Sequence, residues 1–282
     1  MKPAPAYITL IATSLLSELA GLAPRAWADG LPLWTNRYHG PGNGSDFAKA
    51  IAVDSGGNVF VTGYSAGTGT YPYYNDYATV AYSNSGVPLW ASRYDGPASA
   101  EDQAQAVAVD GSGNVFVTGL STGAVGDTDY ATLAYSPLGM PLWTNRYDGS
   151  ANGPDHATAV AVNSSGNVIV TGYSSGIPNV EHVTICYSKT GAPLWTNRYA
   201  PGSGNAETLV MAVDGAGNVF VSGQSPATDA GDYVTVACSG AGVPLWTNFY
   251  GGPVNSTDVP TAIAADKGGN VIVTGYSTGT NA

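Results

Sequence analysis

Charged residues are scarce in this chain of 282 residues, since they make up only 10% of the sequence. Lys and Arg together number nine, against twenty Asp and Glu, which gives a formal net charge of −11. Phosphate backbones and anionic membrane surfaces are bound by clustered Lys and Arg, which this sequence lacks. We therefore expect no nucleic-acid partner, whereas a cationic ligand or a divalent metal suits the charge.

Cysteine and histidine are also rare. Cys186 and Cys238 occupy equivalent strands of successive repeats, one register position apart. Their side chains should therefore point to opposite faces, and we expect buried free thiols rather than a disulfide. The histidines, His39, His156 and His182, fall in different repeats without the spacing of a zinc site. Gly-x-Ser-x-Gly, Walker and Cys-x-x-Cys motifs are absent, so no catalytic residue is predicted.

Only one long apolar run occurs, at residues 8–16. With Lys2 before it and the small-x-small triplet Ala26-Trp27-Ala28 after it, this run predicts a secretory signal peptide over residues 1–28. A buried N-terminal helix is the alternative. The run is shorter than the about 20 residues that a membrane-spanning helix needs, and no other segment is apolar enough. We expect an exported protein (secreted, periplasmic or on the cell surface) without a membrane span.

Glycine and tyrosine, by contrast, are abundant, with 38 and 18 residues. Many belong to a repeated motif whose clearest copy, Asp-Gly-Ser-Gly-Asn-Val-Phe-Val-Thr-Gly, lies at 110–119. A Pro-Leu-Trp triplet recurs with the same period, and its Trp residues are spaced by 56, 53, 52 and 51 positions. A period of about fifty residues is typical of β-propeller blades.

Four β-strand signals follow one another within each repeat. In the second repeat they lie at 104–109, 114–118, 129–135 and 141–147. The first alternates small and branched residues, which suits an innermost strand, and the last begins with proline, which suits an outer edge. The sequence therefore predicts an all-β fold, a β-propeller of four-stranded antiparallel blades.

About five blades are present in the propeller domain, residues 29–282. The repeats lie near 46–94, 102–147, 155–199, 206–250 and 258–282, and an outer-strand signal occupies 31–38. Four blades are complete and the fifth is split or truncated, because its third strand is missing. Either the N-terminal outer strand pairs with the second strand of the last repeat, or the ring is open, or the sequence is truncated. We favour truncation, or one unit of a larger propeller.

The stretch Ala-Val-Ala-Val-Asp-Gly-Ser-Gly-Asn-Val-Phe-Val-Thr-Gly at 106–119 resembles the repeat of the bacterial seven-bladed β-propeller repeat (SBBP) family. It is also similar to NHL repeats. Residues 135–143 are similar to the Trp-docking strand of quinoprotein (PQQ-type) propellers. The resemblance implies a propeller fold and export. The chain lacks the adjacent-cysteine pair of quinoprotein dehydrogenases, so no catalytic residue carries over.

The connections between strands alternate in length, and in an up-and-down meander all the long ones emerge on one face. We look for function on that face. Its longest loop carries Tyr71, Tyr73 and Tyr74, which are candidate ligand-binding residues that would stack on sugar rings or anchor a protein partner. The alternative is that these rings pack over the blade edge.

Carboxylates also gather at this face. Those that open the first strand of a repeat are candidate metal ligands at the mouth of the central channel, where Ca²⁺ would find several oxygens. The alternative is that each one caps its turn or accepts backbone N–H bonds. A second set of carboxylates opens the third strand of the complete repeats. Arginines near the end of the fourth strand are candidate ion-pair partners of these carboxylates. The acidic pair at 127–129 could belong to a metal or acid–base site, but short acidic pairs are common in loops. The first set is Asp46, Asp102, Asp155 and Asp258, and the second is Asp76, Asp129, Glu181 and Asp232.

These features predict an exported, non-enzymatic β-propeller that serves as a binding or scaffold module for a protein or carbohydrate ligand on its long-loop face. No resident cofactor is expected, with Ca²⁺ as the exception that the carboxylates allow. The alternative is a propeller enzyme, quinoprotein-like or carbohydrate-active, with a site in the central channel. A further alternative is a fragment of a larger cell-surface protein. The sequence leaves the ligand, the number of blades and the oligomeric state open.

Overall fold

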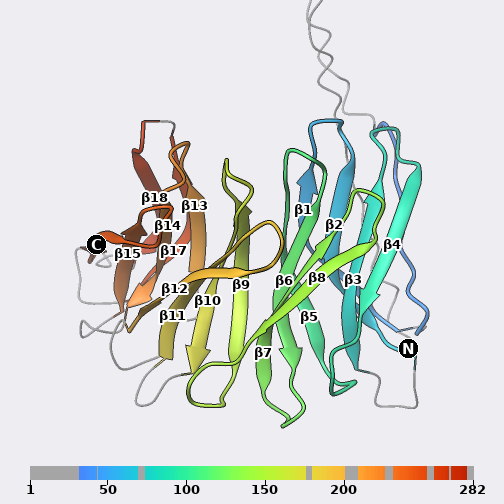
Figure 1. Ribbon diagram of the computed structural model, residues 1–282, viewed down its shortest axis with the longest axis horizontal. Helices are drawn as coiled ribbons and strands as arrows, with labels where there is room; N and C mark the ends of the chain where they lie inside the picture. Colours follow the sequence, from blue (N-terminus) through green and yellow to red (C-terminus); the bar gives the residue numbers. More distant parts are fainter. Residues whose placement is uncertain are drawn as a thin grey trace, which may run out of the picture.

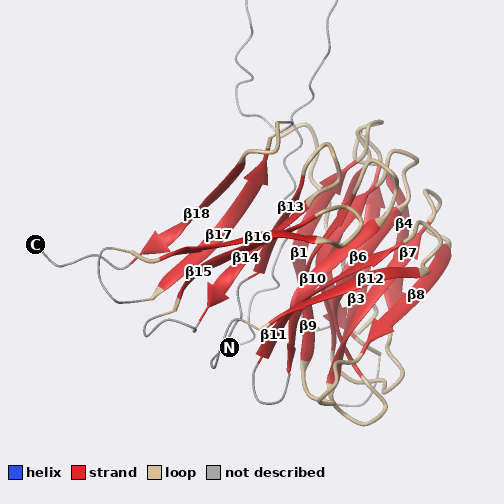
Figure 2. Cartoon of the chain, turned by 60° about the vertical axis from the view of Figure 1, so that its left-hand side comes forward, coloured by secondary structure: helices blue, strands red, loops and turns tan. Residues whose placement is uncertain are grey.

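The computed structural model describes residues 32–42, 44–68, 74–175, 180–200, 209–225, 231–252, 257–266 and 268–277. Every regular element in these ranges is a β-strand, and the strands form five antiparallel sheets (Figures 1 and 2). Four sheets have four strands and the fifth has two. The predicted all-β propeller architecture is confirmed. No helix of the described part is long and apolar enough to span a membrane.

Each four-stranded sheet is a meander whose neighbouring strands follow one another in the sequence. The first sheet comprises β1 (Asp46–Val53), β2 (Val59–Ala66), β3 (Asn75–Tyr82) and β4 (Pro88–Tyr94). The second comprises β5 (Asp102–Val109), β6 (Val115–Thr122), β7 (Thr128–Tyr135) and β8 (Pro141–Tyr147). The third comprises β9 (Asp155–Val162), β10 (Val168–Ser175), β11 (Val180–Tyr187) and β12 (Pro193–Tyr199). The fourth comprises β13 (Leu209–Val213), β14 (Val219–Ser225), β15 (Asp232–Cys238) and β16 (Pro244–Tyr250), and the fifth β17 (Asp258–Ala265) and β18 (Val271–Ser277).

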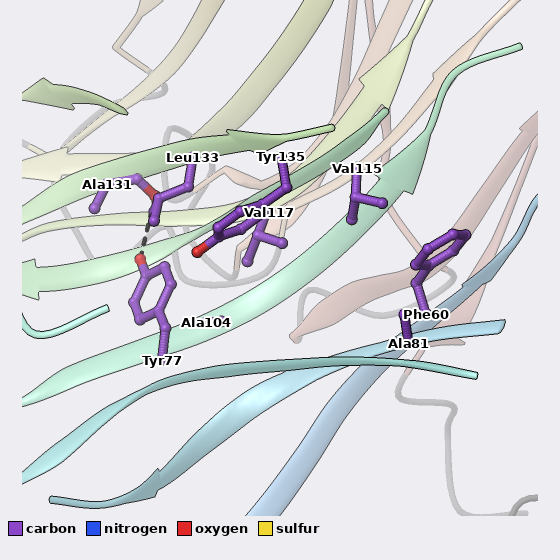
Figure 3. Packing of buried hydrophobic residues seen from close by; sticks show 9 residues of the cluster. All are labelled: Phe60, Tyr77, Ala81, Ala104, Val115, Val117, Ala131, Leu133 and Tyr135. Atoms are coloured by element: carbon purple, nitrogen blue, oxygen red, sulfur yellow. Dashed lines mark hydrogen bonds between the residues drawn. The ribbon is translucent and has the colours of Figure 1, made fainter. Parts of the chain in front are cut away.

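The core lies between successive sheets, because the second and third strands of an interior sheet are covered on both faces. In β6, Val115, Phe116 and Val117 are at most 1% exposed, although they are consecutive and so point to alternate faces. Figure 3 shows the packing between the first two sheets, where Phe60 and Tyr77 of the first sheet belong to the same cluster as the second-sheet valines. The Val-Phe-Val run of the repeat is thus a doubly buried strand.

The repeated tryptophan of the last strand joins its sheet to the next. The indole of Trp90 packs at a tilt against Tyr135, with ring centroids 5.8 Å apart, and its Nε1–H donates to the Pro137 carbonyl at 3.0 Å. Gly139 in the same turn has φ of +77°, and a Cβ there would lie 2.7 Å from the indole. The turn therefore requires glycine both for its backbone conformation and for the close approach of the ring. The same contact recurs as Trp34 on Gly86, Trp143 on Gly191 and Trp195 on Gly242.

A buried tyrosine hydroxyl makes a second bond between sheets. Tyr77 is 1% exposed, and its hydroxyl donates to the Ala131 carbonyl of the next sheet at 3.2 Å (Figure 3). Tyr130 reaches Val183 and Tyr233 reaches Tyr276 in the same way. These bonds hold successive blades in register.

We expect Tyr77→Phe to lower the free energy of unfolding by about 1 kcal/mol, the usual net contribution of one neutral hydrogen bond. The phenyl ring keeps the packing and loses only the bond to Ala131. Urea unfolding of the two proteins measures the difference. Tyr74→Phe is the matched control, because Tyr74 is 49% exposed and should be near neutral. Equal effects of the two substitutions would contradict this role for the buried hydroxyl.

The two ends of the row of sheets do not meet in the described part of the chain. The innermost strands contact one another in sequence order, β1 with β5, β5 with β9, β9 with β13 and β13 with β17. Figure 1 places β4 and β18 toward opposite ends of the longest axis. Residues 32–38 do not form the predicted outer strand, but Trp34 in this segment packs on Tyr82 of the first sheet in the way that the fourth-strand tryptophans pack on the next sheet. In the described ranges β18 pairs only with β17, so the arrangement in which the N-terminal strand pairs with the last repeat is not found.

Both cysteines are buried and free, which confirms the expected thiols. The two side chains point to opposite faces of their own sheets, as expected, and both belong to one cluster between the third and fourth sheets because these sheets are stacked. Cys186 points away from its sheet toward the fourth, whereas Cys238 points back toward the third. Two side chains on opposite faces of stacked sheets can thus share one core.

Candidate functional site

One edge of each four-stranded sheet carries the starts of the first and third strands and the ends of the second and fourth. In the second sheet the register pairs Asp102 with Ser121, Ser121 with Asp129, and Tyr130 with Tyr147. We call this the long-connection edge; in the second sheet it comprises residues 95–102, 121–129 and 147–155. The expected grouping of the long connections on one face follows from this register.

The opposite edge is built from tight turns whose polar residues are engaged in the fold. The Oδ1 atom of Asp110 accepts the backbone N–H groups of Ser112 and Asn114 at 2.8 and 2.9 Å. Gly113 in this turn has φ of +82°. In the third repeat Asn163 replaces the aspartate and accepts the same two bonds. The most conspicuous motif of the sequence is therefore a structural turn, since its carboxylate accepts hydrogen bonds from backbone N–H groups of the same turn.

The carboxylates that open the first strands each close their own loop. Asp102 accepts the N–H of Gly96 at 2.6 Å, and Asp258 accepts that of Gly252 at 2.6 Å. The same six-residue link joins Gly149 to Asp155 and Gly40 to Asp46. Asp102, Asp155 and Asp258 are fully buried. Among the described residues no acidic cluster brings two of the four together, although Asp102 joins Asp76 and Asp95 in one.

Burial shapes the titration of these groups. The pKa of Asp102 is raised chiefly by desolvation, and the bonds from Ser121 and Gly96 oppose that rise. The pKa of Asp155 is raised for the same reason, opposed by Ser174 and Gly149.

The carboxylates of the third strands pair with the arginines of the fourth strands. Asp76 lies 2.7 Å from Arg93, Asp129 lies 2.6 Å from Arg146, and Glu181 lies 3.2 Å from Arg198. The arginine thus pairs within its own sheet, with the third-strand acid. Arg146 also donates to the Ser121 carbonyl at 2.8 Å, which fixes its guanidinium against the end of β6. In the fourth repeat Phe249 stands where the arginine would be.

Of the three candidate tyrosines, Tyr71 and Tyr73 lie outside the described residues. Tyr74 immediately precedes β3 at the long-connection edge and is 49% exposed. Its carbonyl accepts the N–H of Gly67 at 2.8 Å, which closes the base of the longest loop. The ring of Tyr74 is therefore held by a fixed backbone and is open to solvent on the expected edge.

Two carboxylate clusters occupy this edge, in the first two blades. The carboxylates of Asp127, Asp129 and Asp148 each offer an oxygen within 4.8 Å of the others, and Asp76, Asp95 and Asp102 do the same one repeat earlier. The sequence shows Asp127 and Asp129 two positions apart, but it gives no sign that Asp148 joins them. That contact depends on the path of the connection after β8.

The second-repeat cluster contains oxygens without a hydrogen bond from the described part of the chain. Both carboxylate oxygens of Asp127 are buried, and neither meets a hydrogen-bond partner among the described residues. Oδ1 of Asp129 is in the same situation, while its Oδ2 bonds to Arg146. The pKa of Asp129 is raised chiefly by burial and further by the charges of Asp127 and Asp148, although Arg146 opposes the rise. Three acids against one arginine leave an excess negative charge at this point.

Comparisons with known proteins agree with the fold. Residues 37–69 and 92–127 match the SBBP β-propeller repeat, so the chain contains repeats of this kind in its first two blades. A search of curated proteins found no match. The matched stretches include the turns at 54–58 and 110–114 and the carboxylates Asp46 and Asp102.

Several solved structures are similar to this chain at low identity. A protein described as a candidate gluconolactonase is 13% identical, with a TM-score of 0.41 over 80% of this chain and 71% of that one. A glycoside hydrolase is 11% identical, with a TM-score of 0.38 over 79% of this chain and 54% of that one. A eukaryotic initiation factor is 11% identical, with a TM-score of 0.32 over 78% and 57%. At such identities none of them assigns an activity to this chain.

Proposed function

We propose that this chain, which carries SBBP β-propeller repeats, is an exported, non-enzymatic binding module. Its ligand contacts the long-connection edge, and the ligand class that suits this edge best is a protein segment rich in Lys or Arg. The observation that carries the proposal is the cluster of Asp127, Asp129 and Asp148, with its buried oxygens that have no partner among the described residues.

Electrostatics supports a cationic ligand. The buried carboxylate oxygens of Asp127 and Asp129 that lack hydrogen bonds leave negative charge uncompensated, which would attract a Lys ammonium or Arg guanidinium that bonds to the exposed Asp148. Arg146 holds Asp129 in place, whereas the exposed Asp148 contributes a charge at the surface. A second acidic cluster, formed by Asp76, Asp95 and Asp102, adds negative charge to the same edge.

Tyr74 supports a carbohydrate as the second candidate ligand. Its exposed ring on a fixed backbone at the same edge offers a surface on which a sugar would stack. The carboxylates beside it would accept hydroxyl hydrogen bonds. Ca²⁺ is the third candidate ligand, because three carboxylates supply part of the oxygen shell that this ion needs.

The test is the affinity of a hexalysine peptide, measured by isothermal titration calorimetry. We expect Asp127→Asn/Asp148→Asn to weaken binding about five- to tenfold, because it removes two favourable charge interactions of the usual surface magnitude. The control is Asp110→Asn/Asp214→Asn, which makes the same change in charge on the opposite edge. There, Asn163 shows that asparagine supports this turn.

Equal weakening by the two double variants would mean that net charge alone governs binding, and it would refute a site at this edge. Abolition of peptide binding by millimolar Ca²⁺, with stoichiometric Ca²⁺ uptake that the first variant loses, would instead identify the metal as the ligand.

A further inference from the structure

The third strand of each complete sheet ends in a residue that faces the preceding sheet or the N-terminal segment. In the first three sheets this residue is a tyrosine whose ring packs on a tryptophan of that neighbour: Tyr82 on Trp34, Tyr135 on Trp90 and Tyr187 on Trp143. In the fourth sheet the residue is Cys238, which belongs to the same cluster as Trp195. The junction between the third and fourth sheets therefore lacks an aromatic ring that the preceding junctions contain.

A second tyrosine is replaced on the other side of the same junction. His182 of β11 occupies the position from which Tyr77 and Tyr130 reach across to the backbone of the next sheet. His182 is 2% exposed, and neither Nδ1 nor Nε2 has a hydrogen-bond partner among the described residues. The backbone of Gln224 is near enough to oppose the lowering of the His182 pKa, but it makes no hydrogen bond of ordinary geometry. A buried imidazole without partners is unfavourable, because it carries one donor and one acceptor when neutral.

A cavity lies between the third and fourth sheets, beside these two replacements. Its volume is about 120 Å³. An apolar cavity of about 150 Å³ holds one benzene molecule, so this cavity has room for a single small ring. Residues of both sheets line it, among them His182, Thr184, Asn197, Val221, Val236 and Cys238. The cavity thus combines apolar walls with one buried polar group that lacks a partner in the described part of the chain.

We propose that this cavity is a binding site for a small neutral phenol. The ring of the ligand occupies the space that Tyr135 and Tyr187 fill at the preceding junctions, on the side of Trp195. Its hydroxyl donates to the unprotonated ring nitrogen of His182. The molecule itself specifies this ligand class, because both of the side chains that are replaced here are phenols in the other repeats.

The charges around the cavity favour a neutral ligand. Arg198 also lines the cavity, but its guanidinium already pairs with Glu181 at 3.2 Å. A charged ligand would lose its hydration without gaining an unpaired opposite charge. The cavity lies between the third and fourth sheets, whereas the acidic clusters belong to the first two. The phenol site is therefore independent of the ligand proposed for the long-connection edge.

The probe is para-fluorophenol, which is titrated with the full chain and followed by fluorine NMR. We expect saturable binding of one molecule per protein. Para-fluorotoluene should bind about fivefold more weakly, because its methyl group leaves the imidazole of His182 without a hydrogen bond of the usual net contribution.

Two cysteine variants locate the site. Cys238→Tyr restores the residue of the other sheets and fills the cavity, so it should abolish saturable binding of para-fluorophenol. Cys186→Ala is the matched control, because Cys186 belongs to the same cluster but is not among the described residues that line the cavity. Its affinity for para-fluorophenol should be unchanged. If Cys238→Tyr does not fold, His182→Tyr fills the cavity from the third sheet and removes the imidazole, with the same expected loss.

Four outcomes would overturn the proposal. The first is equal affinity for para-fluorophenol and para-fluorotoluene, since the cavity would then be merely apolar. The second is undiminished binding by the folded Cys238→Tyr or His182→Tyr protein. The third is the absence of saturable binding up to the solubility limit of the phenol, because other residues of the chain would then fill the cavity. The fourth is tighter binding of N-acetyltyrosinamide than of para-fluorophenol, which would identify a tyrosine side chain of another polypeptide as the ligand.

Discussion

Gly119→Ala is expected to lower the free energy of unfolding by about 3 kcal/mol, the upper end of the usual cost of overpacking a core. A Cβ on Gly119 would lie 2.0 Å from the Gln103 carbonyl oxygen and 2.9 Å from the hydroxyl of Tyr77. The first contact is with backbone of the neighbouring strand, and the second is with the tyrosine that bonds to Ala131. The substitution therefore has to move both a strand and a contact between sheets.

The control for this prediction lies a few residues away in the same repeat. A Cβ on Gly111 would have no neighbour within 4 Å. Gly111→Ala should therefore change the unfolding free energy by less than about 1 kcal/mol, and its sign depends on the entropy of the unfolded chain. Urea unfolding of both variants decides the matter. A Gly119→Ala protein as stable as Gly111→Ala would show that the glycine of the Val-Thr-Gly motif is not required by packing.

Acid should destabilise the protein through His182, by about 2 kcal/mol at pH 5 and about 3 kcal/mol at pH 4. His182 is 2% exposed, and burial lowers its pKa to about 4, with the backbone of Gln224 opposing the shift. In the unfolded chain the imidazole has an ordinary pKa of about 6.5. The unfolded state therefore takes up a proton first as the pH falls. The contribution of neutral His182 is complete above about pH 6.5 and is lost progressively toward pH 4.

The chain itself offers the matched variant, because tyrosine occupies this position in the other three complete sheets as Tyr77, Tyr130 and Tyr233. His182→Tyr should remove the decrease in unfolding free energy that protonation of His182 causes between pH 7.5 and pH 5. Buried carboxylates such as Asp102 have raised pKa values and so act in the opposite direction, but they are common to both proteins and cancel in the difference. If the unfolding free energies of both proteins fall equally with acid, His182 is not the group responsible.

Much of the fold could be predicted because its signals repeat. The predicted strand at 141–147 agrees with β8, and the one at 129–135 begins one residue after the start of β7. The first strand was predicted two residues too short at its N-terminus, because Asp102 and Gln103 break the alternation of small residues although they pair with β6. Local periodicity therefore located the strands, and only backbone pairing fixed their ends.

The candidate site was less predictable, because it depends on contacts between loops. The link from Asp102 to Gly96 has a visible signal, a glycine six residues before the aspartate that recurs in four repeats. The approach of Asp148 to Asp127 and Asp129 has none, since it depends on how the connection after β8 turns. The exposure of Trp246 on β16 had a visible signal as well, because the third-strand signal is missing from the fifth repeat. Its exposure follows from what the next sheet lacks in its described part.

The most direct test of the central claim is the hydrogen-exchange footprint of the hexalysine peptide on the full chain. We expect slower exchange of amides in residues 121–129 and 147–155, where the carboxylate cluster lies, and unchanged exchange in the turn at 110–114. Protection confined to the turns of the opposite edge, or no local protection at saturating peptide, would contradict a binding site at the long-connection edge.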